Sequence, residues 1–386
     1  MAHVREITRA DGRTAFEARW RDGGKFRQRT FTVKRDAERF ALKVENGIAA
    51  GESTDLLTRN GKTVRDVVEG SMEASRPELK PRTYRSYRAI YDNRILPRFG
   101  ARRVSSVTRA EVQAFVAELH GAGLAPATVH HHYVALRKAM RFAQEDRLIV
   151  HNPCDGVRLP KSHEADQFEP VFLTAAEVGR LSAALDDREP YGLLIRFAAW
   201  TGLRAGEIAG LRVRDLNLRT TQPQVEVRQT MQRIAGEWVA GTPKSARSTR
   251  NVPLHNRELR SELRLFLLAH PRSGDPDALL WPGRAVGSHA VDYLRVFDVA
   301  SFRRNYMRPA LRSLGMREMR FHDLRHTFAS LMLAVPEYAP RRVSHWMGHA
   351  NLNTTDMIYG HLYESDGEAD ADALDAFLDR AAKASS

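Results

Sequence analysis

The sequence is poor in the features that mark exported or membrane proteins. Cys154 is the only cysteine among 386 residues, so no disulfide can form within the chain. The segment from Met1 to Arg9 lacks the succession of positive, apolar and small residues found in a secretory signal. No apolar run approaches the roughly 18 residues that a membrane-spanning helix needs. These absences predict a protein of the reducing cytoplasm with no membrane partner.

Acidic residues are also in deficit, because 47 Asp and Glu face 60 Lys and Arg and the net charge is +13. A basic chain favours a polyanionic partner, since each phosphate neutralised by Lys or Arg releases condensed counterions. Charge alone leaves DNA, RNA and acidic membranes open. Basic residues crowd the first fifty positions, whereas residues 364–379 are acidic, so we do not expect the end of the chain to lie on a polyanion.

The length of the chain predicts several domains, and composition breaks divide it into residues 1–55, 63–155 and 168–386. In the first, the alternation over residues 14–21 predicts a strand of a small antiparallel sheet. Asp36 is expected to cap a helix that covers this sheet and that Gly47 ends.

The second domain reads as all-helical. Thr108 and Glu111 form a capping-box pattern. Its Arg-rich faces either contact a polyanion or are simply solvated. Three adjacent histidines at 130–132 point in different directions on a helix, so no metal site is expected there. A helical stripe is formed by Val129, Tyr133, Leu136, Met140 and Ala143.

The third domain is predicted to be helical with an island of strands. Thr174 and Glu177 form another capping box, and residues 224–254 read as a short antiparallel sheet. Within that island, a turn would extend Lys244 away from the sheet, where its ammonium can protonate a leaving oxygen or contact a phosphate.

Two further motifs place cations at helix beginnings. Gly202 can end one helix so that Arg204 starts the next, with Glu207 one turn later to hold the guanidinium. The spacing of His322 and Arg325 lets both converge on one anion. Taken singly, a surface ion pair and a buried structural histidine are the commoner interpretations.

The last motif surrounds a tyrosine. Gly348 marks a helix end that leaves His349 in a tight connection, and Tyr359 follows on a short helix. A phenol has a pKa of about 10, so it needs nearby cations or a base to act as a nucleophile. A lone tyrosine is more often a core residue.

The order Arg204, Lys244, His322 with Arg325, His349 and Tyr359 resembles the tyrosine recombinase family, the phage integrases, over about 168–363. The resemblance implies a mainly α fold with small β-sheets. A catalytic domain (168–386) would follow a helical, SAM-like core-binding domain (63–155), and the two would clamp DNA. Residues 1–55 resemble, more loosely, the three-stranded arm-type DNA-binding modules of some phage integrases.

The resemblance also assigns roles. Tyr359 would attack phosphorus to give a 3'-phosphotyrosine and a free 5'-hydroxyl; Tyr363 is the local rival, and Met347 stands where leucine is usual. No metal, ATP or other cofactor is implied, because fixed cations stabilise the transition state. The resemblance implies that Arg204 and Arg325 brace the non-bridging oxygens and that Lys244 protonates the leaving oxygen. His322 would assist proton transfer, His349 would hydrogen-bond the phosphate, and Glu207 would orient its neighbours.

The implied activity is site-specific recombination of phage or mobile-element DNA at attachment sites on the bacterial nucleoid. Four strands must be broken and each break consumes one Tyr359, so a homotetramer on DNA is expected; an excisionase or DNA-bending protein is a further candidate partner. The alternatives are strand relaxation of the type IB topoisomerase kind and a catalytically silent DNA-binding regulator. One stripe near the end forms either local core or a contact with a neighbouring protomer: Leu374, Phe377, Leu378 and Ala381.

Overall fold

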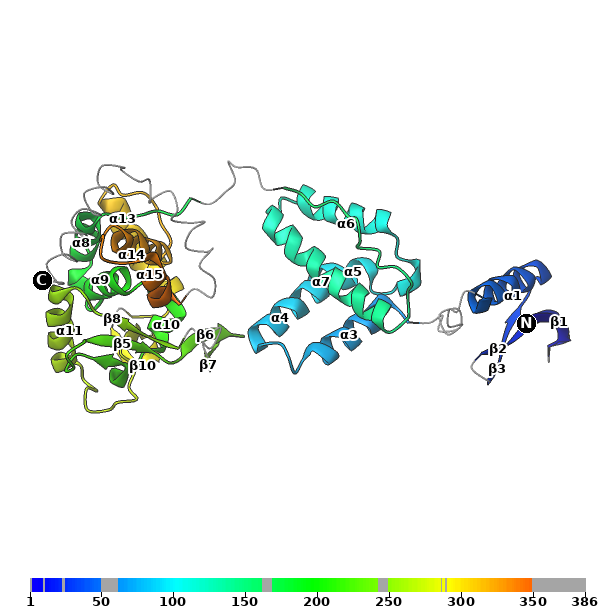
Figure 1. The fold of residues 1–386 in the computed structure, drawn as a ribbon, viewed down its shortest axis with the longest axis horizontal. Coiled ribbons are helices and arrows are strands. Elements are labelled where there is room, and N and C mark those ends of the chain that lie inside the picture. Colours follow the sequence, from blue (N-terminus) through cyan, green and yellow to red (C-terminus); the bar gives the residue numbers. More distant parts are fainter. Residues whose placement is uncertain are drawn as a thin grey trace, which may run out of the picture. The chain divides into compact units, whose positions relative to one another are not determined.

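The computed structural model divides into two compact units, Met1–Gln167 and Phe168–Ser386, and each is described by itself. None of the helices described is long and apolar enough to cross a membrane. Figure 1 shows the helices and strands in order along the chain. The structure describes residues 2–9, 11–22, 25–49, 62–161, 169–241, 249–285, 287–288 and 290–348.

The chain begins with a three-stranded antiparallel sheet in the order β1-β2-β3. The helix α1 (Lys34–Ala49) covers the sheet, and the rings of Trp20 and Phe40 meet edge to face at 5.4 Å between centroids. The predicted strand over 14–21 is therefore confirmed as part of β2. The strands are β1 (His3–Thr8), β2 (Thr14–Asp22) and β3 (Lys25–Phe31).

Both predicted ends of α1 are wrong. The helix begins at Lys34, and the backbone N–H of Asp36 already donates to the carbonyl of Val33 within the first turn. Asp36 is thus a first-turn acid near the positive end of the helix dipole rather than the cap. The helix also continues through Gly47 to Ala49, because one glycine costs a helix only about 1 kcal/mol.

The next segment is all-helical, and its helices pack around α7 (Pro126–Glu145). The predicted stripe is confirmed, since all five of its residues are buried on α7. Thr108 caps α6 with the predicted capping box. The other elements are α3 (Val64–Ser75), α4 (Pro81–Ile90), the π-helical turn Tyr91–Ile95, α5 (Leu96–Phe99), the 3₁₀ turn Val104–Ser106 and α6 (Arg109–Gly121).

The second unit is built around α9 (Tyr191–Thr201), which contacts α8, α11 and α14. Thr174 caps α8 with its predicted capping box. The other helices are α8 (Ala175–Ala183), α10 (Ala205–Gly210), α11 (Arg257–Ala269), α12 (Val299–Phe302), α13 (Arg308–Ser313), α14 (Asp323–Leu333) and α15 (Pro340–Met347), with short turns at Asp186–Arg188, Val213–Asp215 and Arg303–Met307.

The strand island forms two sheets where the sequence predicted one. One sheet has the order β4-β5-β8, and β6 pairs with β7 as a separate hairpin. Ala235 and Gly236 both have positive φ, of 53° and 89°, which suits a tight two-residue hairpin turn. The strands are β4 (Leu216–Asn217), β5 (Gln224–Val227), β6 (Thr230–Ile234), β7 (Glu237–Gly241) and β8 (Arg250–Pro253), followed by the pair β9 (Pro282–Arg284) and β10 (Val291–Val296). The fold is mainly α with small β-sheets, as expected.

Candidate active site

Arg204 lies at the start of α10, where the sequence predicted it. Gly202 ends α9 in the left-handed conformation with φ of 62°, and the chain then turns into α10. The Arg204 guanidinium donates to Glu207 Oε1 at 2.8 Å, and the Arg204 backbone N–H donates to Glu207 Oε2 at 2.9 Å. Glu207 is buried, whereas 35% of the Arg204 side chain is exposed. Glu207 therefore fixes a guanidinium that still reaches solvent.

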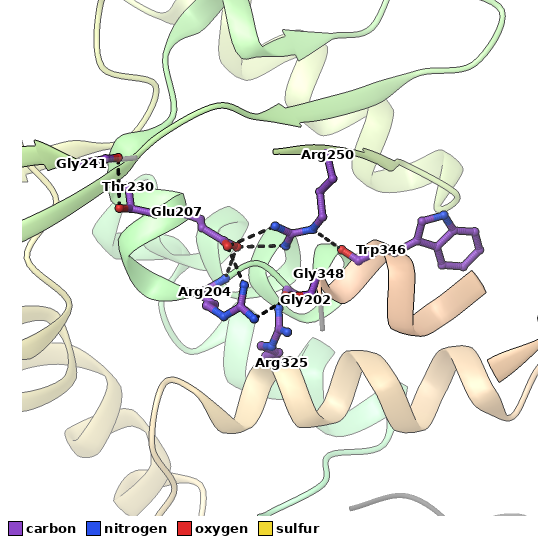
Figure 2. A network of polar contacts seen from close by, with 9 residues as sticks. All are labelled: Gly202, Arg204, Glu207, Thr230, Gly241, Arg250, Arg325, Trp346 and Gly348. Atoms are coloured by element: carbon purple, nitrogen blue, oxygen red, sulfur yellow. Dashed lines mark hydrogen bonds and ion pairs between the residues drawn. The ribbon is translucent and has the colours of Figure 1, made fainter. Parts of the chain in front are cut away.

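The same carboxylate has a second cationic partner, Arg250 at the start of β8, as Figure 2 shows. The fully buried Arg250 side chain donates from Nη1 to Glu207 Oε1 at 3.1 Å and from Nη2 to Glu207 Oε2 at 3.0 Å. Burial alone would raise the pKa of Glu207, but hydrogen bonds and charge from Arg250, with the charge of Arg204, leave that pKa lowered. Glu207 is thus an anion shared by two guanidinium groups.

The end of α15 joins this network. Gly348 ends the helix with φ of 67°, and its carbonyl accepts a hydrogen bond from Arg204 Nη2 at 3.0 Å. The carbonyl of Trp346 accepts from Arg250 Nε at 2.5 Å. Both arginines are therefore hydrogen-bonded to the last turn of α15, directly before His349.

Arg325 enters the site from the first turn of α14. It is buried, and its Nη1 donates to the carbonyl of Gly202 at 2.7 Å. On the same helix Leu324 and Phe328 are buried, and Leu331 packs against the same core. The structure thus brings Arg325 to the turn that precedes Arg204, although 123 residues separate Arg325 from Gly202.

His322 occupies the N-terminal end of α14 with an exposed side chain. Partial withdrawal from water and the positive charges of Arg325, His326 and Arg320 lower its pKa to about 4. Its imidazole is therefore neutral at pH 7 and can accept or donate a proton. Two anchored guanidinium groups beside a neutral imidazole suit the stabilisation of a phosphoryl oxyanion.

Three of the predicted site residues, Lys244, His349 and Tyr359, lie outside the described residues, as does the rival Tyr363. Of the other four, Glu207 is hydrogen-bonded to Arg204, and Arg325, three residues after His322 at the start of α14, reaches the turn before Arg204. Among the described residues, no group of three or more His, Cys, Asp or Glu could hold a metal ion.

Arg250 is the member of this cluster to which the sequence assigned no role. It stands at the end of the basic run around Lys244, where nothing local distinguishes it from solvated arginines. The sequence offered only an indirect reason to expect a second arginine beside Glu207. A buried glutamate needs more positive charge than one partly exposed arginine supplies.

Two family models match the chain. The model described as the phage integrase family matches residues 171–366, and the phage integrase N-terminal SAM-like domain matches residues 63–120. The described part of the site lies within the first match.

Relatives and solved structures agree with these matches. The ICEBs1 integrase of Bacillus subtilis is 25% identical over 78% of this chain and 79% of its own length. The integrase of Mycobacterium phage L5 is 28% identical over 86% of this chain and 81% of its own length. The Tn1549 transposon integrase in complex with a circular intermediate DNA superposes with a TM-score of 0.65 at 21% identity, covering 81% of this chain and 99% of that one. A lambda integrase dimer bound to a core site gives a TM-score of 0.57 at 17% identity, over 93% and 95% of the two chains.

Proposed function

The chain belongs to the phage integrase family of tyrosine recombinases, and from that premise we propose that it recombines phage or mobile-element DNA at attachment sites. The observation that carries the proposal is that Arg325 donates to the carbonyl of Gly202, in the turn directly before Arg204, while the charge of Arg325 acts on the nearby His322. The names of relatives, integrases of a mobile element and of a phage, support the choice of substrate.

In this reaction, Arg204 and Arg325 hold the non-bridging oxygens of the scissile phosphate. Guanidinium groups form bidentate, charge-assisted hydrogen bonds with phosphate. Each preorganised donor in such a site is worth about 100- to 1000-fold in rate, by analogy with oxyanion holes. The positive charge of these arginines stabilises the negative charge of the transition state, so the proposed step requires no metal, ATP or other cofactor.

Tyr359 is the proposed nucleophile. Its oxygen attacks phosphorus, the 5' oxygen leaves, and the phosphate remains on the protein as a 3'-phosphotyrosine. Lys244 gives a proton to the leaving oxygen, neutral His322 assists proton transfer, and His349 donates to the phosphate. The reverse attack by a 5'-hydroxyl of the partner strand restores the DNA without an external energy source.

The proposed partners are two double-stranded attachment sites and three further copies of this chain. A complete exchange breaks four strands and each break uses one Tyr359. A lambda integrase tetramer bound to a Holliday junction is among the similar structures, with a TM-score of 0.55. An excisionase or DNA-bending protein is a further proposed partner, and the cytoplasmic nucleoid is the proposed place of action. Residues 1–55, 63–155 and 168–386 are proposed as the arm-binding, core-binding and catalytic domains.

A nicked suicide substrate tests the chemistry. The nick lets the short fragment that carries the free 5'-hydroxyl diffuse away, so the phosphotyrosine adduct accumulates and is measured as a shifted band on a denaturing gel. Tyr359→Phe is expected to abolish the adduct while DNA affinity stays unchanged, because only the nucleophilic oxygen is removed. Tyr363→Phe is the matched control and is expected to form the adduct normally.

Other outcomes have distinct meanings. An adduct that persists in Tyr359→Phe and vanishes in Tyr363→Phe would move the nucleophile. Relaxation of supercoiled DNA without recombinant product would favour the topoisomerase alternative, and binding without any adduct from the native chain would favour a silent regulator.

A further inference from the structure

The Arg250 side chain is fully buried in the network of Figure 2, yet the proposed chemistry gives it no contact with DNA. We propose that Arg250 is a positioning residue that holds Arg204 in place for the scissile phosphate. It acts through Glu207, which both arginines share, and through the last turn of α15, to which both are bonded. This inference rests on the proposed recombination reaction.

The sharing of Glu207 is the first step of the argument. Glu207 Oε1 accepts from Arg204 at 2.8 Å and from Arg250 at 3.1 Å. Glu207 Oε2 accepts from the Arg204 backbone at 2.9 Å and from Arg250 Nη2 at 3.0 Å. Without Arg250, a buried carboxylate would have Arg204 as its remaining guanidinium partner among the contacts described. Glu207 would then bind Arg204 more strongly and compete with the phosphate for its donors.

The last turn of α15 is the second step. Arg250 donates to the carbonyl of Trp346, and Arg204 donates to that of Gly348. Cations are stabilising at a helix C-terminus, where the last carbonyls have no partner within the helix. Arg250 therefore fixes the same turn that Arg204 binds, so its removal is expected to loosen the contact between Arg204 and the carbonyl of Gly348.

Stability alone does not account well for this arrangement. The cost of removing two charges from water often equals the attraction between them, so a buried ion pair is weak evidence of a stabilising role. Fixed geometry is what a bidentate pair with a further backbone contact provides, and catalysis requires a fixed donor. The prediction is therefore a defect in the chemical step that depends on the charge of the scissile phosphate.

The test measures single-turnover adduct formation by the full chain on two nicked substrates. One carries the native scissile phosphate and the other a methylphosphonate, in which a methyl group replaces one non-bridging oxygen and removes the negative charge. Arg250→Met is expected to slow the reaction on the phosphate about 100-fold, the effect associated with one misplaced donor. On the methylphosphonate the effect is expected to fall below about 10-fold, because an uncharged group depends less on Arg204.

Two further variants complete the design. Arg196→Met is the matched control: Arg196 pairs with Glu262 in the same unit and has no described contact with Glu207 or α15. It is expected to leave the rate on both substrates within about 2-fold, because Arg196 lies outside the contacts that hold Arg204. Arg250→Lys keeps the positive charge but loses the paired N–H donors of the guanidinium group. We therefore expect a smaller decrease in rate, with the same dependence on substrate charge.

The outcomes separate the inference from the function on which it rests. An equal decrease on both substrates, or no decrease on either, in Arg250→Met would overturn the positioning role. If Arg250→Met fails to fold by circular dichroism, Arg250→Lys decides by the same comparison. Failure of the native chain to form an adduct would instead refute the proposed function, before any variant is compared.

Discussion

At the scale of single residues, the site depends on two glycines as much as on its arginines. Gly202 and Gly348 each end a helix with positive φ. A Cβ on Gly202 would lie 2.4 Å from Phe328 Cδ1, and one on Gly348 would lie 3.0 Å from Arg250 Nη1. Their carbonyls accept from Arg325 and Arg204. Glycine is therefore required both by the backbone conformation and by the close approach of a neighbouring side chain.

The role of the Gly348 contact can be separated from backbone strain. Gly348→Ala is expected to lower the free energy of unfolding by about 1–2 kcal/mol from the left-handed backbone alone, and to slow adduct formation because the methyl group displaces the Arg250 guanidinium. Gly315 has almost the same φ, 65° against 67°, but a Cβ there meets nothing within 4 Å. Gly315→Ala should therefore lower stability by a similar amount, measured by urea denaturation, without slowing the adduct. Equal rates for the two variants would contradict the role of the contact.

At the scale of elements, the sequence specified what is decided within one turn. The capping boxes at Thr108 and Thr174 are confirmed, as are the ends of α9 and α15 at Gly202 and Gly348. Each of these signals involves partners at most a few residues apart, so spacing alone reveals them.

Features that depend on tertiary packing could not be predicted from local spacing in the sequence. The helix α1 continues through Gly47 to Ala49, against the local stop signal. Arg250 is hydrogen-bonded to Glu207, from which it is separated by 43 residues in the sequence, and to Trp346, from which it is separated by 96. Spacing could suggest that Arg204 and Arg325 each bind an anion, but their meeting at Gly202 was implied only by the family resemblance.

The capping box of α8 gives a prediction with a defined pH dependence. Thr174→Ala is expected to destabilise the second unit by about 1 kcal/mol at pH 7, since the Thr174 side chain caps the N–H of Glu177. Hydrogen bonds from the Thr174 backbone and hydroxyl lower the pKa of Glu177 below its ordinary value of 4.5. The part of the stabilisation that depends on the charge of Glu177 is therefore fully present above pH 4.5. It is lost as the pH falls through the lowered pKa.

Thermal unfolding of the native chain and Thr174→Ala at several pH values measures this effect. Thr63→Ala removes the corresponding capping box of α3, in the first unit, and is the control. It should leave the transition of the second unit unchanged. A gap between native chain and Thr174→Ala that stays constant down to about pH 3 would contradict the contribution of the Glu177 charge.

At the scale of the whole molecule, three segments each enclose their own buried residues. Trp20, Ala37 and Val44 are buried in the first, and separate clusters of buried residues run from Val64 to Cys154 and from Val171 to Met347. Segments with independent cores generally fold without one another. Residues 62–386 should therefore keep their fold when residues 1–61 are removed.

The first segment has surface features suited to nucleic acid. Phe26 is 77% exposed, and the guanidinium of Arg21 lies 5.2 Å from its ring centroid. An exposed aromatic ring beside a cation can pack on sugars or bases while the cation binds phosphate. The basic residues crowded into the first fifty positions can neutralise further phosphates beyond the core site.

Removal of residues 1–61 is thus expected to separate binding from chemistry. On a nicked duplex limited to the core site, residues 62–386 should form the phosphotyrosine adduct at the rate of the full chain, because Arg204, His322 and Arg325 are all retained.

On a longer duplex with flanking sequence, the plot of the logarithm of the binding constant against the logarithm of salt concentration should become less steep by about 0.9 for each phosphate that residues 1–61 had neutralised. Fluorescence anisotropy at several salt concentrations measures that slope. An unchanged slope would show that the first segment does not lie on DNA, and the absence of an adduct on the core duplex would show that this segment takes part in assembling the catalytic unit.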